Sequence, residues 1–185
     1  MNNQQKLFKH DPRNANSLAD RNVMAMQPDG EGNIWMATHF TGLEKFNIKT
    51  EQFTHIRHDK NNPASLVNDS THFLFFDTQH YLWIGTHNGL SRMDIKTGSC
   101  TNYINDPKDS LSLGKGTLYS IAQDKNDIIW IGMVDIYALD TKTGKFQRYK
   151  ISSGTILNIC IDATGKIWAS GSDGLYFFDK QKNSF

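Results

Sequence analysis

The chain has 185 residues, 38% of them hydrophobic, which is enough for one buried core without disulfide or metal staples. Its 20 basic and 19 acidic residues are spread without runs and leave a formal charge of +1, so charge does not favour binding to nucleic acid or to an anionic membrane. The sequence shows neither a signal peptide nor the roughly 18 consecutive apolar residues of a membrane span, so such segments of an exported parent protein would lie outside this chain.

Four copies of one pattern follow one another along the chain. They read NIWMATHFTGLEKFNIKT (33–50), YLWIGTHNGLSRMDIKTG (81–98), IIWIGMVDIYALDTKTG (128–144) and KIWASGSDGLYFFDKQK (166–182). Each copy has one tryptophan with an aspartate six residues before it, and the pairs are Asp29 and Trp35, Asp77 and Trp83, Asp124 and Trp130, and Asp162 and Trp168. This periodicity predicts four repeats, at approximately 9–53, 54–100, 101–146 and 147–185.

Each repeat is expected to form four short strands. The chain begins with an outer-strand piece, QKLFKHDP (5–12), and the second repeat offers THFLFF (71–76), YLWIGT (81–86), LSRMDI (90–95) and CTNYI (100–104). In the third repeat, Ile129 and Ile131 point to one side of a strand and Trp130 to the other, so this strand must be covered on both faces. The fourth repeat is shorter because KISSG (150–154) replaces a longer loop.

Small antiparallel sheets of four strands, each covered by its two neighbours, describe an all-β fold, the β-propeller. The alternative is a β-solenoid, whose shorter repeats carry one strand per face, so the propeller is the better interpretation. Cys100 and Cys160 lie at non-equivalent positions and form no CxxC motif, so both are expected to be buried free thiols rather than a disulfide or zinc site.

The repeats resemble the two-component regulator propeller repeats. The resemblance rests on the pattern D-x-x-G-x-[IL]-W-[IM]-[GA]-T-x-x-G-L-x-x-[FYM]-[DN]-x-x-T-G-x-F and on an N/D-x-SL loop before each inner strand. The third repeat departs from the pattern at Met133, Asp135 and Ile136, and the fourth lacks the SL loop. Such repeats build the periplasmic sensor regions of bacterial hybrid histidine kinases and of some diguanylate cyclases, which implies a periplasmic module with a signalling output domain in the same parent chain.

Two arrangements of the ring remain open. An N-terminal strand could complete the last blade and close a ring of four repeats, or the chain could be part of a larger propeller. We expect the second, because closing four blades needs wide wedge angles between them and members of the resembling family usually continue for more repeats.

Among the seven histidines, His39 and His87 both follow the W-x-x-T of their repeats and open the same loop of adjacent blades. Two imidazoles on one rim could contact a ligand, and the alternative is that they cap strand ends beside solvent. His55 and His58 are spaced i, i+3, which places them on opposite faces of a strand, so this pair does not predict a metal site.

The four aspartates could bind calcium or cap turns. Calcium needs about six to eight oxygen ligands, and each turn offers only one or two carboxylates, so capping is the better interpretation. The four tryptophans could be sugar-stacking platforms, but their position in mid-strand favours the core. All eight residues are therefore expected to be structural, and the sequence predicts no catalytic residue, metal or cofactor.

Function is expected on the face that holds the mouth of the central channel, where the long and variable loops lie. These loops are 13–21, 59–69, 106–116 and 150–154, together with 39–42, 87–89, 134–135 and 172–173. The candidate ligand contacts on them are Arg21, His39, Asn68, His87, Lys115, Asp135 and Asp173. The uniform DxxG and DxKTG turns of the opposite face are expected to be structural.

Three functions remain in competition. The first, implied by the resemblance, is an extracytoplasmic module that binds a small ligand such as a glycan and signals to a kinase or cyclase output, without catalysis in this segment and in a parent that could be a homodimer. The second is a propeller lyase similar to streptogramin lyases, which need a histidine base and a metal-binding acid on one face of a closed ring. The third is a passive protein-interaction scaffold.

Overall fold

The computed structural model describes residues 6–151 and 154–185, and within them all regular structure is antiparallel β-sheet. Blade 1 holds β1 (Val23–Pro28), β2 (Asn33–Thr38), β3 (Leu43–Asn47) and β4 (Gln52–Ile56). Blade 2 holds β5 (Thr71–Phe76), β6 (Tyr81–Thr86), β7 (Gly89–Asp94) and β8 (Cys100–Tyr103). Blade 3 holds β9 (Ser120–Gln123), β10 (Ile128–Gly132), β11 (Ile136–Asp140) and β12 (Lys145–Tyr149), and blade 4 holds β13 (Ile156–Ile161), β14 (Ile167–Gly171) and β15 (Gly174–Phe177).

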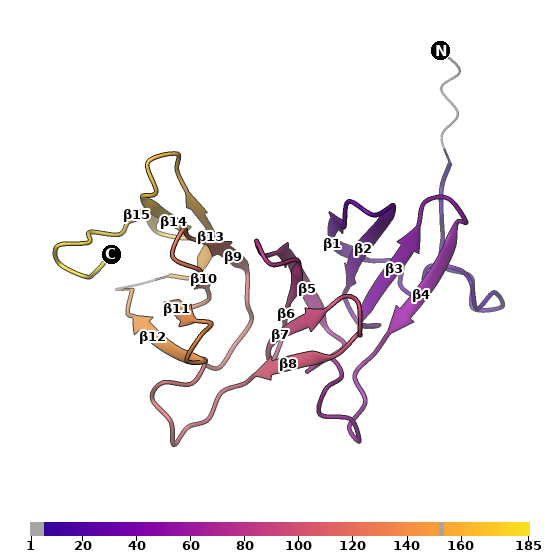
Figure 1. Cartoon of the computed structure of the whole chain (residues 1–185), viewed down its shortest axis with the longest axis horizontal. Helices are drawn as coiled ribbons and strands as arrows, with labels where there is room; N and C mark the ends of the chain where they lie inside the picture. Colours follow the sequence, from indigo (N-terminus) through magenta and orange to yellow (C-terminus); the bar gives the residue numbers. More distant parts are fainter. Residues whose placement is uncertain (1–5, 152–153) are drawn as a thin grey trace, which may run out of the picture.

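The four sheets stand side by side in an open arc (Figure 1). Their first strands, β1, β5, β9 and β13, contact one another in that order, while blades 1 and 4 lie at opposite ends of the arc. The described residues therefore form propeller blades that do not close into a ring, and the all-β propeller prediction is confirmed. No helix occurs in the described part of the chain, so none there could cross a membrane.

The second strand is buried on both faces in blades 1 to 3, as its sequence predicts, whereas Trp168 of β14 in blade 4 stays partly exposed. In β10, Ile129 and Ile131 pack in one core cluster with Trp83 of blade 2. Trp130, between them in sequence, packs in a different cluster with Ile159 of blade 4. Each gap between blades is thus a separate hydrophobic core, and blade-on-blade packing holds the arc together.

Each aspartate six residues before a tryptophan caps the turn between the first two strands of its blade. In blade 2, Oδ1 of Asp77 accepts hydrogen bonds from the backbone N–H of Gln79 and of Tyr81, both at 2.9 Å. Its other oxygen, Oδ2, accepts one from the indole Nε1 of Trp83, also at 2.9 Å. The capping prediction is confirmed, and the structure adds the bond from the indole.

The same bond from indole to carboxylate recurs in every blade, at 3.2 Å for Trp35, 3.2 Å for Trp130 and 2.8 Å for Trp168. Burial raises the pKa of Asp29, but hydrogen bonds from Asn33, Glu31 and Trp35 outweigh this effect and hold the pKa below its usual value. The Asp29 carboxylate therefore stays ionised as an acceptor of N–H donors.

The SL loop that precedes each of blades 1 to 3 is closed by its serine and held in a hydrophobic core by its leucine. In blade 2, the Oγ of Ser65 accepts a hydrogen bond from the backbone N–H of Asp59 and donates one to a backbone carbonyl of the same loop, which closes the loop. The following Leu66 is fully buried in the core between blades 1 and 2. Equivalent serines and leucines occur in the other loops, namely Ser17 with Leu18 and Ser112 with Leu113.

Two expectations about the ends of the arc are wrong. The described part of QKLFKHDP forms no strand, and Phe8 instead packs its ring against Phe46 and Phe53 of blade 1. An outer strand needs the third strand of its own blade as a hydrogen-bonding partner, and the described chain offers none there. Cys160 is exposed rather than buried, because it lies in blade 4 and no further described sheet covers that blade; Cys100 is buried, and burial raises the pKa of its thiol to about 11.

We expect Asp77→Ala to lower the free energy of unfolding by about 2–3 kcal/mol, because it leaves two backbone N–H groups and a buried indole N–H without their charged acceptor. The matched control is Asp94→Ala in the same blade, which removes one bond, to the backbone N–H of Lys96, and should cost about 1 kcal/mol or less. Urea denaturation measures both losses. Equal losses would contradict the role of the indole bond, and a fall in melting temperature on adding EDTA would favour calcium over capping.

Candidate functional site

A β-bulge interrupts the first strand of three blades near its start, on the side of the arc that holds the loops between β2 and β3 and between β6 and β7. The register shifts between Val23 and Ala25 in blade 1, between Thr71 and Phe73 in blade 2, and between Ile156 and Asn158 in blade 4. The bulge residues, and Tyr119 at the equivalent position of blade 3, stand five residues before the capping aspartates; they are Met24, His72, Tyr119 and Leu157. The bulge removes these residues from the strand's regular alternation and leaves them at least partly exposed.

Three imidazoles meet on this face in a line that we call the histidine row: His39, His72 and His87. His39 begins the loop between β2 and β3, and His87 begins the equivalent loop between β6 and β7. The ring of His72 lies between them, with its centroid 5.7 Å from that of His39 and 6.4 Å from that of His87. Phe40, whose side chain is 67% exposed, stacks on His39 with 3.9 Å between ring centroids.

Hydroxyl groups are the hydrogen-bonding neighbours of two members of the row. Nε2 of His72 lies 3.3 Å from the Oγ of Ser70, and Nδ1 of His87 lies 3.1 Å from the Oγ1 of Thr117. Desolvation lowers the pKa of His72, and the like charges that His39 and His87 acquire on protonation lower it further. The row is therefore a set of coupled imidazoles in which the central ring resists protonation.

The sequence predicted His39 and His87 on one rim, and the structure brings them together through His72. Phe40 and His72 were missed. The signal that could have found His72 is its position five residues before Asp77, which it shares with one residue in each of the other repeats. The shared position alone does not predict an exposed side chain, because the sequence does not show that a bulge occurs there.

The other predicted contacts lie apart from the row or serve the fold. Asp135 is buried and accepts hydrogen bonds from the Nε of Arg148 and from the backbone N–H of Ile151, so it has a structural role. Asn68 caps its own loop by accepting from the backbone N–H of Ser70.

Three predicted contacts are exposed. Arg21 lines a hollow beside the N-terminal segment, together with Phe8 and His10. Lys115 lies on the loop before β9, and Asp173, in blade 4, accepts a hydrogen bond from the hydroxyl of Tyr176. The structure therefore does not gather the seven predicted contacts into one site.

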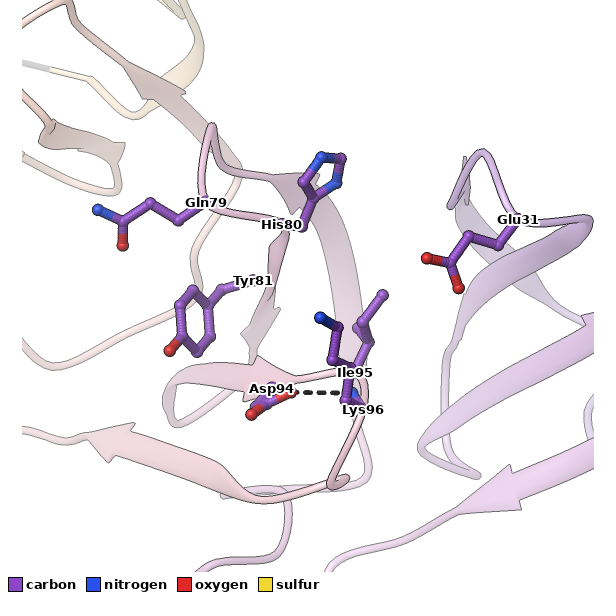
Figure 2. A pocket seen from close by; sticks show the side chains of 7 residues that line it. All are labelled: Glu31, Gln79, His80, Tyr81, Asp94, Ile95 and Lys96. Carbon is purple, nitrogen blue, oxygen red and sulfur yellow. Dashed lines mark hydrogen bonds between the residues drawn. The ribbon is translucent and has the colours of Figure 1, made fainter.

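A second hollow, of about 240 Å³, lies on the opposite face, between the turns of blades 1 and 2. Figure 2 shows Glu31 of blade 1 facing His80 and Lys96 of blade 2 across this gap, with Tyr81 turned away from Glu31. The lining belongs to the turns that the sequence predicted to be structural, and one dashed bond, from the backbone N–H of Lys96 to Asp94, is such a turn cap.

Comparisons with known proteins agree with the architecture. Residues 17–40 match the family model described as "Two component regulator propeller". The resemblance to two-component regulator propeller repeats is confirmed. Over 78 residues, or 42% of this chain, the sequence is 28% identical to "Histidine kinase P4" of Formosa agariphila, of which the match covers 6%.

Solved structures of low sequence identity share the fold of this chain. The extracellular domain assigned to a hybrid two component system of B. thetaiotaomicron matches with a TM-score of 0.84 at 22% identity, over 96% of this chain and 25% of that one. A streptogramin B lyase matches with a TM-score of 0.64 at 16% identity, over 91% of this chain and 58% of that one. The segment thus spans about a quarter of the extracellular domain that it matches.

We expect acid to destabilise the folded chain in part through His72. Because the folded state lowers the pKa of this imidazole, the unfolded chain binds its proton more readily, so the stability contribution is present above about pH 6.5 and is lost as the pH falls below it. The melting temperature of His72→Gln should therefore fall less than that of the wild type on acidification in a buffer of weakly binding anions. His80→Asn, an exposed histidine of the opposite face, is the matched control, and a His72→Gln curve parallel to the wild type would contradict the assignment.

Proposed function

We propose that the chain is part of an extracytoplasmic ligand-sensing propeller in a bacterial signal-transduction protein, and that this segment carries no catalysis. The observation that carries the proposal is the histidine row with Phe40 beside it. A phenylalanine that is 67% exposed and three clustered imidazoles, none of them fully buried, contribute little to packing between blades. Groups of this kind on a rigid scaffold are typical of binding surfaces.

The end faces of the arc support the proposal that the parent propeller has further blades. Met26 of blade 1 is 62% exposed, although the equivalent residues of blades 2 and 3, Leu74 and Ile121, are buried. At the other end, Leu175 of blade 4 is 69% exposed, and its neighbour Phe177 is 46% exposed. Apolar sheet faces of this kind are covered by the next blade elsewhere in the arc, so further blades at both ends would complete the same packing.

The partners follow from the same proposal. The ligand is a small molecule, and a glycan suits an exposed aromatic ring because the apolar face of a sugar can stack on it. The output is a histidine kinase or diguanylate cyclase domain of the same parent chain. The propeller itself lies in the periplasm, and the parent protein is a possible homodimer. The match to a histidine kinase and the fold of an extracellular two component domain support this assignment.

A panel of neutral and acidic oligosaccharides, added to the whole chain, tests the proposal by thermal melting. A ligand at about 100 times its Kd should stabilise the folded state by about 2.7 kcal/mol and raise the melting temperature by several degrees. Phe40→Ala should abolish the shift, whereas Phe177→Ala, an exposed aromatic residue at the end of the arc, should retain it.

Two results would count against ligand sensing at this rim. A shift that survives Phe40→Ala and disappears in Tyr81→Ala would place binding in the hollow of Figure 2. Melting temperatures that do not respond to any member of the panel would favour a passive scaffold.

A further inference from the structure

The histidine row differs from His55 in what surrounds it. His55 lies with Nδ1 2.5 Å from a carboxylate oxygen of Glu44, so a proton on that ring meets a counter-charge. His72 and His87 instead have hydroxyl neighbours, Ser70 and Thr117. A hydroxyl can donate to a neutral imidazole or accept from a protonated one, so it fits both states without neutralising the charge.

The carboxylates on the neighbouring loops already have partners. Asp20 accepts a hydrogen bond from the backbone N–H of Phe40, and Asp69, on the loop before β5, accepts one from the backbone N–H of His58. The loops that flank the row also carry exposed cations, among them Arg21 and Lys115. Asp20 and Asp69 thus have backbone amides as hydrogen-bond donors, and neither forms a described hydrogen bond or ion pair with a ring of the row.

We propose that the histidine row is a proton-linked binding site for an acidic oligosaccharide, whose carboxylate or sulfate groups supply the direct anionic contact that no described carboxylate makes with His39, His72 or His87. This inference rests on the proposed ligand-sensing function and names the ligand class. Phe40 offers an exposed ring at one end of the row for a sugar face. The ring spacings of 5.7 and 6.4 Å allow one flexible ligand to contact two imidazoles at once.

Proton linkage follows from the electrostatics of the row. Without a ligand, protonation of the central ring is opposed by its desolvation and by charge on its two neighbours. A bound anion reverses this balance because it attracts each added proton, so binding takes up protons from solution. By reciprocity, the ligand binds more tightly as the pH falls through the range in which imidazole titrates.

Isothermal titration of the whole chain tests the site with three probes: digalacturonate, a sulfated chondroitin disaccharide and neutral cellobiose. We expect at least one acidic probe to bind about tenfold more tightly at about pH 5.5 than at about pH 7.5, as uptake of one proton by an imidazole allows. Repeating the titration in two buffers of different ionisation enthalpy gives the number of protons taken up on binding, because the observed heat then differs by the heat of buffer ionisation. The tighter of the two acidic probes identifies the anion as carboxylate or sulfate.

Variants assign the effect to the row. His72→Gln should remove most of the pH dependence and the proton uptake, and His87→Gln, on an exposed loop, provides the same test if the first variant is unstable. The control is His80→Asn, which removes an exposed histidine at a φ of 63°, a backbone conformation that asparagine tolerates. The control should bind the acidic probe as the wild type does.

The result separates the two proposals. If cellobiose binds equally well at both pH values and loses affinity in Phe40→Ala, ligand sensing at the rim stands and the anion site is wrong. If neither acidic probe binds, or if binding is unchanged in both His72→Gln and His87→Gln, the anion site is likewise overturned.

Discussion

The hydrogen bond from each tryptophan indole to the aspartate six residues before it is the interaction on which the rest of this structure depends. One carboxylate oxygen holds the turn between the first two strands, and the other fixes the indole in the gap between blades. The next blade can then pack over an indole whose position is fixed. Trp83 and Trp130 are consequently almost fully buried, whereas Trp168 stays partly exposed because no described blade follows it.

This frame leaves the mouth of the channel free to vary. The same structural position, five residues before the capping aspartate, holds a methionine, a histidine, a tyrosine and a leucine in the four blades; they are Met24, His72, Tyr119 and Leu157. All four side chains are at least partly exposed, at a bulge in blades 1, 2 and 4 and directly before β9 in blade 3, so packing between blades places little demand on their identity. A rigid repeat with unconstrained rim residues can carry a binding surface on two adjacent blades without any cost to the core.

Much of the fold could be predicted because its determinants are local. The bounds of β5 and β6 agree with the predicted runs 71–76 and 81–86, and β7 begins one residue earlier than predicted. The site was only half predictable. His39 and His87 share a repeat position, but His72 reaches them from another strand, and Asp135 looked like a ligand contact until its ion pair with Arg148 was seen. Side chains that meet across blades leave no periodic signal in the sequence.

The sequence by itself determined the turn caps and the strand pattern of blades 1 to 3, because each depends on residues within about six positions of one another. The expected fourth strand of blade 4 is wrong, since that sheet has three strands in the described residues. Only the tertiary structure decided which faces are covered and which imidazoles meet. Cys100 and Cys160 illustrate the difference, since one is buried and the other exposed according to whether a further sheet lies against its blade. Burial and side-chain contacts between blades depend on neighbours about 30 or more residues away in the sequence. Local hydrophobic patterning does not predict such contacts.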